Sequence, residues 1–232
     1  MSTAEPLTLY VVIAAGGYGS RMNSSVPKQF LPLNGKPLMV HTLQRIHACW
    51  PDALFFVALA EEHFSQWKKL RKKYLSQLNI TEVKGGATRF HSVKNCLRHL
   101  RKPGIVVIHD ACRPLVSKEL LQRCLNQALR TGCAVPVVDV QDSLRELLTS
   151  GSRHRSRSRF RLVQTPQCFD VQLIKDAYQQ TFQKEFTDDA SVLEAAGGII
   201  HLIDGEPSNM KITTPLDLMV AEKLIAAFPG PE

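Results

Sequence analysis

The sequence lacks any apolar run close to the ~18 residues that a membrane-spanning helix needs. Its N-terminal segment has neither the basic stretch nor the long apolar core of a secretory signal. The compositional bias of a disordered or collagen-like chain is also missing, since 44% of its 232 residues are apolar and 22% are charged. These absences predict a folded, cytoplasmic protein that does not insert into a membrane.

Metal-binding cysteine patterns are absent as well. The sequence has six cysteines, but it has no CxxC pair and no Cys or His spacing typical of a zinc site. Most of these residues lie in apolar segments, where a cysteine behaves as a small hydrophobic residue. We therefore expect reduced thiols, most of them in the core, at Cys49, Cys96, Cys112, Cys124, Cys133 and Cys168.

Positive charge is in excess, with 29 Lys and Arg against 21 Asp and Glu, a net charge of +8. This excess favours an anionic partner, such as a nucleotide, a sugar phosphate, a nucleic acid or a membrane surface. Five arginines between positions 153 and 161 suggest nucleic-acid binding, but they alternate with other residues and only Phe160 offers a base-stacking surface. A solvated hairpin whose arginines reach an anionic substrate is the favoured interpretation.

Short apolar runs alternate with amphipathic stretches along the chain. Strands are expected at 9–14, 53–59 and 133–140, with helical patterns between them. Because strand, helix and strand at this spacing indicate parallel pairing, we predict an α/β fold with a doubly wound sheet. The alternation breaks at 139–163, which is expected to form a projecting β-arm. We predict a single domain over 1–232 that carries this arm.

A glycine-rich loop, AGGYGSRM at 15–22, follows the first predicted strand. Glycine allows backbone N–H groups to approach a phosphate closely. The loop is not a Walker A motif, because no GKS or GKT follows, and Met22 replaces the third glycine of a dinucleotide fingerprint. Together with Arg21 and Lys28 it suits a triphosphate whose α-phosphorus is attacked while pyrophosphate leaves. The alternative is a tight turn with solvated cations.

Three further segments carry candidate site residues. Asp110 ends an apolar strand, where a carboxylate can hold Mg²⁺ against nucleotide phosphates, and Arg113 follows it. We expect the neighbouring His109 to be a buried, hydrogen-bonded imidazole. The segment at 85–93 has a glycine pair and polar groups for a base or ribose, or it simply begins a helix. Lys211 lies in an apolar run, expected to be a strand, and points into a site or snorkels to solvent.

Six motifs between about 9 and 222 occur in one order: AGGxGxRM, PKQFL, HDAxRP, QTPQxF, TDDAS and NxKITxPxDL. Together they resemble the 2-C-methyl-D-erythritol 4-phosphate cytidylyltransferase family of the non-mevalonate isoprenoid pathway. The resemblance implies that CTP and methylerythritol phosphate are joined with loss of pyrophosphate, using Mg²⁺. It also implies a Rossmann-like nucleotidyltransferase sheet and a homodimer whose subunits exchange the β-arm.

The resemblance also implies a role for each matching position. Arg21 and Lys28 correspond to stabilisers of the transition state around the triphosphate. Nucleotide contacts fall on Ala15, Gly16, Gly17, Gly19, Gly86, Arg89, Ser92, Asp110 and Ala111. Asp110 is also the expected metal ligand. The acceptor is positioned by Arg113, Ser143, Arg157 and Lys211.

The sequence departs from the family pattern at two places. The stretch around Ser143 is longer than the usual form, and Ala87 stands where an acidic residue is common. The change at Ala87 is harmless if only a backbone N–H reads cytosine, but it affects base selectivity if a side chain does. A ribitol 5-phosphate cytidylyltransferase is an alternative with the same chemistry. A non-catalytic nucleic-acid-binding protein is another, although it would need neither the phosphate loop nor Asp110.

Overall fold

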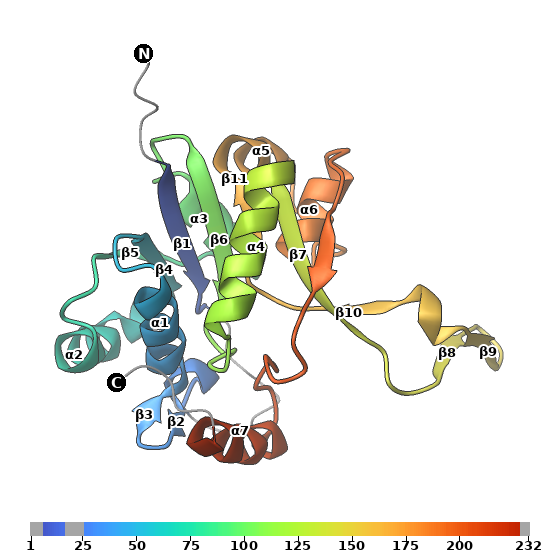
Figure 1. The fold of residues 1–232 in the computed structure, drawn as a ribbon, viewed down its shortest axis with the longest axis horizontal. Coiled ribbons are helices and arrows are strands. Elements are labelled where there is room, and N and C mark those ends of the chain that lie inside the picture. Colours follow the sequence, from blue (N-terminus) through green and yellow to red (C-terminus); the bar gives the residue numbers. More distant parts are fainter. Residues whose placement is uncertain (1–6, 17–25, 228–232) are drawn as a thin grey trace.

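The computed structural model describes residues 7–16 and 26–227, and its centre is an eight-stranded, largely parallel sheet (Figure 1). The strand order is β10-β7-β11-β6-β1-β4-β5, and β12 pairs with β7. The strands β10 and β11 run antiparallel to their neighbours. The bounds are β1 (Thr8–Ala14), β4 (Leu54–Leu59), β5 (Ile80–Lys84), β6 (Gly104–Asp110), β7 (Cys133–Asp139), β10 (Arg161–Val163), β11 (Gln167–Asp170) and β12 (Leu202–Asp204). The predicted doubly wound α/β sheet is confirmed.

The helices are α1 (Leu38–Cys49), α2 (Phe64–Tyr74), α3 (Arg89–Leu97), α4 (Lys118–Thr131), α5 (Val171–Ala177), α6 (Asp189–Ala195) and α7 (Pro215–Ala227). Short 3₁₀ helices occur at η2 (Lys28–Phe30), η3 (Glu61–His63) and η4 (Arg157–Arg159). Over the described residues, none of these helices combines the length and the apolar character needed to cross a membrane.

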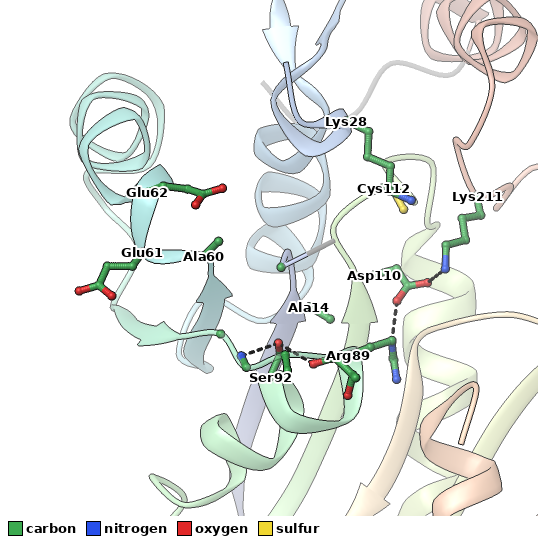
Figure 2. Close-up of a pocket in the computed structure, with 15 residues that line it drawn as sticks. Ala14, Lys28, Ala60, Glu61, Glu62, Arg89, Ser92, Asp110, Cys112 and Lys211 are labelled. Carbon is green, nitrogen blue, oxygen red and sulfur yellow. Dashed lines mark hydrogen bonds and ion pairs between the residues drawn. The ribbon is translucent and has the colours of Figure 1, made fainter. Parts of the chain in front are cut away.

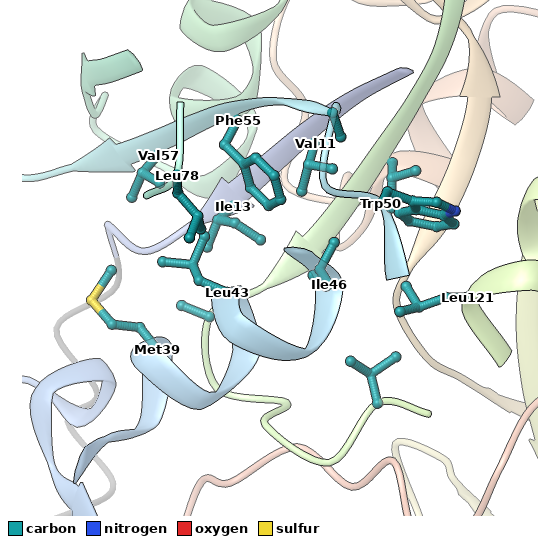
Figure 3. Packing of buried hydrophobic residues seen from close by; sticks show 14 of the residues in the cluster. Val11, Ile13, Met39, Leu43, Ile46, Trp50, Phe55, Val57, Leu78 and Leu121 are labelled. Atoms are coloured by element: carbon teal, nitrogen blue, oxygen red, sulfur yellow. The ribbon is translucent and has the colours of Figure 1, made fainter. Parts of the chain in front are cut away.

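Helices cover both faces of the sheet, and β1 shows why the strands are apolar throughout. Side chains of a strand alternate between the two faces of a sheet. Val11 and Ile13 pack with α1, α2 and α4, whereas Tyr10 and Val12 pack with α3, α5 and α6. Figure 3 shows the first of these clusters, in which Leu43 of α1 lies against the sheet. A parallel strand buried on both faces requires the continuous apolar run seen in the sequence.

The parallel strands end together at one edge of the sheet. Ala14 at the end of β1 is in register with Asp110 of β6 on one side and Ala58 of β4 on the other. The chain runs from β1 to β4 and β5, and then returns to place β6 on the opposite side of β1. Ligands of such sheets bind beyond the carboxyl ends, where the strand order reverses. This edge therefore positions the candidate site.

A smaller unit beyond this edge contains β2 (Pro32–Leu33), β3 (Lys36–Pro37) and α7. Leu33, Leu38 and Ile212 contribute to its apolar cluster. The expectation of a strand around Lys211 is wrong, because residues 209–213 are irregular. The apolar character of this segment reflects the burial of Ile212 in the cluster, where its N–H donates to the Cys112 carbonyl at 2.9 Å.

The β-arm leaves the sheet after β7 and returns through β10 (Figure 1). Its outer part is a hairpin of β8 (Leu144–Leu147) and β9 (Ser152–Arg155), which project away from the body of the protein. An ion pair between Arg155 and Glu146, at 2.7 Å, joins the two strands. The return strand β10 pairs with β7 in antiparallel register, Leu162 opposite Val138. The projecting arm predicted from the sequence is therefore present.

Candidate active site

An open pocket of about 410 Å³ lies at the carboxyl ends of β1, β4, β5 and β6 (Figure 2). It is lined by Ala14, Gly16, Lys28, Ala60, Glu61, Glu62, Gly85, Gly86, Ala87, Thr88, Arg89, Ser92, Asp110, Cys112 and Lys211. A smaller pocket of about 210 Å³ adjoins it and shares Arg89, Asp110 and Lys211. Residues from distant parts of the sequence thus meet around one carboxylate, Asp110, which both pockets share.

Three cations surround the Asp110 carboxylate. The Nε atom of Arg89 donates to Oδ1 at 3.2 Å, and the Nζ atom of Lys211 donates to Oδ2 at 2.8 Å. The Nε atom of Arg113 lies 3.8 Å from Oδ2. Burial alone would raise the pKa of Asp110, but the three cations outweigh burial and hold the pKa well below its usual value. The carboxylate is therefore charged throughout the physiological pH range.

The backbone of Asp110 is fixed by its neighbours. Its N–H donates to the Thr165 hydroxyl at 3.1 Å, and the same hydroxyl is 3.0 Å from Nδ1 of His109. The other ring nitrogen of His109 lies 3.1 Å from the Arg113 carbonyl. Burial, the dominant cause, lowers the pKa of His109 to about 4. His109 is thus a neutral, hydrogen-bonded core residue, as predicted, and it is not available as a general base.

Arg113 lines the smaller pocket and is held there by hydrogen bonds. Its Nη1 donates to the Asn209 carbonyl at 2.8 Å, while its buried Nε has no hydrogen-bond partner and faces Asp110. The amide of Asn209 in turn donates to the Thr165 carbonyl at 2.7 Å. These bonds fix the irregular segment that carries Lys211, so the side chain of Lys211 points to Asp110 (Figure 2). The structure therefore places Arg113 and Lys211, both predicted site residues, beside the same carboxylate.

Lys28 also lines the larger pocket, and its side chain ends beside Cys112 (Figure 2). It begins η2, and this short helix is tied to the start of the glycine loop because the Gln29 amide donates to the Ala15 carbonyl at 2.7 Å. Of the predicted loop residues, Gly16 lines the pocket. The predictions for Arg21, Gly17 and Gly19 fall outside the described residues.

The glycine pair after β5 lines the same pocket. The Gly85 N–H donates to the Leu59 carbonyl at 2.8 Å, and the Gly86 N–H donates to the Ser92 hydroxyl at 3.0 Å. A Cβ at Gly86 would lie 2.3 Å from the Cβ of His91, so a glycine is required there. The Ser92 hydroxyl also donates to the Thr88 carbonyl at 3.0 Å. The Ser92 hydroxyl thus uses both of these hydrogen bonds to hold the loop that lines the pocket.

Arg89 and Ala111, both predicted to contact the nucleotide, form hydrogen bonds within the protein. The sequence predicted Arg89 beside a base or ribose, but its guanidinium lies between Asp110 and the buried Asp189. Asp189 belongs to the TDDAS motif, to which the sequence gave no role. The Ala111 backbone donates to the Ala14 carbonyl at 3.3 Å and its carbonyl accepts from Thr42, so Ala111 joins β6 to β1 and α1. A nucleotide contact by either residue stays a prediction.

The two arm residues lie apart from this site within one chain. Arg157 donates to the Gln141 carbonyl at the base of the arm and lines a separate surface pocket with Asp139 and Arg161. Ser143 is exposed just before β8. Neither residue is among those that line the pockets around Asp110 in the described part of the chain. A single chain thus does not bring them to Lys211 and Arg113.

Known proteins resemble this chain in sequence and in structure. A family model described as 2-C-methyl-D-erythritol 4-phosphate cytidylyltransferase matches residues 9–227. A relative of that name from Bacteroides thetaiotaomicron is 45% identical over 215 residues, covering 93% of this chain and 98% of its own. Another from Porphyromonas gingivalis is 42% identical over 219 residues, with 94% and 98% covered.

A crystal structure of the Thermus thermophilus protein of the same name shares the fold, with a TM-score of 0.77 at 34% identity. The match covers 95% of this chain and 100% of that one. The Rossmann-like sheet and these matches define the chain as a nucleotidyltransferase. More narrowly, the chain belongs to the 2-C-methyl-D-erythritol 4-phosphate cytidylyltransferase family, as its motifs indicated.

Proposed function

We propose that the Asp110 site transfers the cytidylyl group of CTP to 2-C-methyl-D-erythritol 4-phosphate and releases pyrophosphate, in isoprenoid precursor biosynthesis. The observation that carries this assignment is the pair of adjoining pockets that share one carboxylate and the cations around it. Two anionic substrates need such an arrangement in order to approach each other. None of the relatives described above is named for ribitol 5-phosphate, so that alternative has no support among them.

CTP fits the larger pocket and the acceptor fits the smaller one. Gly16, Gly85 and Gly86 present backbone to the larger pocket, where a base, a ribose and phosphates can approach closely. Lys28 faces the same space and would contact the triphosphate, together with Arg21. Arg113 and Lys211 line the smaller pocket and would bind the acceptor phosphate.

The reaction needs charge compensation more than proton transfer. A phosphate monoester is already an anion near pH 7, so it can attack the α-phosphorus without a general base. The neutral, fully bonded state of His109 is consistent with this chemistry. The barrier arises from repulsion between the two substrates, and preorganised cations lower that barrier. Arg21 and Lys28 would stabilise the charge on the triphosphate, while Arg113 and Lys211 position the acceptor.

Asp110 is the residue that would hold Mg²⁺. The described residues contain no cluster of three or more His, Cys, Asp or Glu side chains that could hold a metal by themselves. Mg²⁺ in nucleotide enzymes is usually bound by one or two carboxylates together with substrate phosphates and water, and the charged Asp110 fits that pattern. When bound there, the ion would neutralise phosphate charge as the pyrophosphate leaves. Lys211 would then exchange its contact with Asp110 for the acceptor phosphate.

A homodimer would bring the β-arm to this site. Arg157 and Ser143, expected to position the acceptor, lie on the arm and away from the Asp110 pockets of their own chain. The arm also exposes large apolar side chains, at Leu147, Phe160, Leu162 and Val163. Exposed apolar groups of this kind are typical of surfaces that another chain covers. The proposed arrangement is an exchange in which each arm completes the site of its partner.

Backbone groups would read the base. Ala87 lines the larger pocket next to Gly86, and its methyl group cannot accept or donate a hydrogen bond. Cytosine recognition at this position would therefore depend on backbone N–H and C=O groups, for which no acidic side chain is needed.

The direct test is pyrophosphate release in the presence of Mg²⁺. CTP is paired with 2-C-methyl-D-erythritol 4-phosphate or ribitol 5-phosphate, and ATP, GTP and UTP serve as controls. We expect release only with CTP and methylerythritol phosphate. Activity with ribitol phosphate alone would move the protein to another pathway, and activity with all four nucleotides would refute base reading by the backbone.

A further inference from the structure

We propose that Asp189 is a positioning residue for cytidylyl transfer: by holding Arg89, it fixes the orientation of the Asp110 carboxylate. The inference rests on the function proposed above and adds a residue that belongs to α6. Its evidence is a chain of hydrogen bonds that runs from α6 through Arg89 of α3 to the end of β6 and joins two buried carboxylates (Figure 2 shows the Arg89–Asp110 end).

The guanidinium of Arg89 uses all three of its nitrogen atoms on carboxylates. Nη1 and Nη2 donate to the two oxygen atoms of Asp189 at 2.9 and 2.7 Å, and Nε donates to Asp110 at 3.2 Å. A two-bond contact between a guanidinium and a carboxylate fixes the plane of both groups. Because the Nε–H lies in that plane, the direction of the contact with Asp110 follows from the position of Asp189.

Asp189 is itself held rigidly. Its side chain is fully buried, and the Tyr178 hydroxyl donates to Oδ1 at 2.6 Å. Its backbone N–H donates to the Gln167 side chain at 3.0 Å. Gln167 belongs to β11 and is in register with Ile108 of β6, two residues before Asp110. Asp189 and Asp110 are therefore attached to the same part of the sheet, and Arg89 spans the two.

This arrangement separates the cations of the site into two groups. Both terminal nitrogen atoms of Arg89, Nη1 and Nη2, donate to Asp189. This pair of nitrogen atoms therefore cannot turn toward a triphosphate while the contact lasts. Arg89 stays on one oxygen of Asp110, whereas the other oxygen contacts Lys211, whose side chain is more exposed. Lys211 and Lys28 are thereby left for the substrates. The sequence predicts a direct contact between Arg89 and the nucleotide. In the proposed arrangement Arg89 instead acts on the nucleotide through Asp110.

The test is a double-mutant cycle between Asp189→Asn and Asp110→Asn. Alone, Asp189→Asn should lower kcat on the order of tenfold, because an orienting contact is lost while the substrate contacts remain. The KM for CTP should change less than about threefold, which separates this effect from lost binding. In the Asp110→Asn background the same substitution should lower the residual kcat less than about twofold, since coupled residues are not additive.

A second readout does not depend on turnover. Calorimetry measures CTP binding with and without Mg²⁺: Asp189→Asn should weaken the increase in affinity that Mg²⁺ gives, and leave metal-free binding unchanged. Tyr178→Phe removes only the hydroxyl donor to Asp189, so it tests the same chain if Asp189→Asn does not fold. It should shift kcat in the same direction, by about two- to threefold.

Glu82→Gln is the matched control. Glu82 of β5 forms an ion pair with Arg71 of α2 at 3.1 Å, so the substitution also breaks a contact between a carboxylate and an arginine, but at a place outside the two pockets. It should leave kcat and CTP binding unchanged. Equal losses from Asp189→Asn in both Asp110 backgrounds, or a lower melting temperature with normal kcat and normal Mg²⁺ dependence, would overturn the proposal. A wild-type chain that is inactive with CTP and methylerythritol phosphate would count against the proposed function instead, and the binding measurement would still decide the role of Asp189.

Discussion

The pocket at the end of β6 and the β-arm both carry several cations, but they present them in opposite ways. Around Asp110 the charged groups are buried or half-buried and are fixed by hydrogen bonds that cross the sheet. On the arm, Arg157 and its neighbours are exposed, and their contacts remain within the arm and its base. Contacts within one chain thus fix the first set of groups, whereas they leave the second set exposed.

The strongest test of the pocket side of this comparison is Lys28→Ala. Losing a preorganised charge at the triphosphate should reduce kcat on the order of 10²-fold or more. A substitution on the arm tip that also removes one positive charge, Arg153→Ala, is the matched control and should change kcat less than about twofold. Steady-state pyrophosphate release measures both, and a loss below threefold for Lys28→Ala would contradict its assigned role.

Arg157→Ala tests the arm side. We expect the KM for methylerythritol phosphate to rise on the order of tenfold, with a smaller effect on the KM for CTP, because a charged contact to the acceptor is lost. The reverse order would refute its placement at the acceptor.

Mixing variants shows whether the arm acts on its own chain. Lys28→Ala and Arg157→Ala chains, unfolded together and refolded at equal ratio, should recover about a quarter of wild-type activity when the acceptor is kept well below its KM. This value follows because half of the dimers are mixed and one of their two sites is intact. If each arm served its own chain, the mixture would show no more activity than the average of the two variants.

Two glycines, one in the pocket and one at the arm tip, should respond differently to substitution by alanine. Gly86→Ala should weaken CTP binding on the order of tenfold, since the added Cβ would meet the Cβ of His91 at 2.3 Å and displace the glycine pair that lines the pocket. Gly151→Ala at the arm tip meets no atom within 4 Å, although its φ of +76° favours glycine. It should cost about 1 kcal/mol of local stability and leave CTP binding unchanged. Equal effects of the two substitutions on CTP binding would contradict this contrast.

The smallest effect near neutral pH concerns His109. Burial lowers the pKa of His109 from 6.5 to about 4, so protons bind more readily to the unfolded chain than to the folded one. Its contribution to stability is therefore complete above pH 6.5 and is lost as the pH falls toward 4. The loss should reach about 1 kcal/mol at pH 5.5 and roughly 3 kcal/mol near pH 4.

Urea unfolding at pH 7 and pH 5.5, with His109→Asn as the comparison, measures this contribution. The variant should be less stable at pH 7 and should show a weaker decrease between the two values. An equal pH dependence in both proteins would show that other groups control acid unfolding.

Much of the site could be predicted because its residues stand at positions that local rules define. Asp110 follows an apolar strand, the glycines follow strands, and the ends of parallel strands meet at one edge. These rules do not extend to Lys211, whose apolar neighbours predict a strand that the structure does not contain. Ile212 is apolar because it fills a cluster with α7, and burial of a loop residue gives the same local pattern as a strand.

Arg89 and Asp189 show what the sequence could not supply. They are 100 positions apart, and their pairing depends on how α6 docks on β11 after the sheet has formed. No periodicity carries that information. The pattern around Arg89 is equally typical of a solvent-facing helix start, and the acidic pair in TDDAS is equally typical of a helix cap.

The position of Arg157 on the arm has a consequence for how activity depends on the amount of protein. If each arm completes the site of another chain, a separated subunit keeps its CTP pocket but loses an acceptor contact. Dilution would then reduce the activity per molecule, since association is governed by mass action. A cell that doubles its supply of this chain from a low level would gain more than twice the cytidylyl transfer, so expression level would regulate flux without any effector.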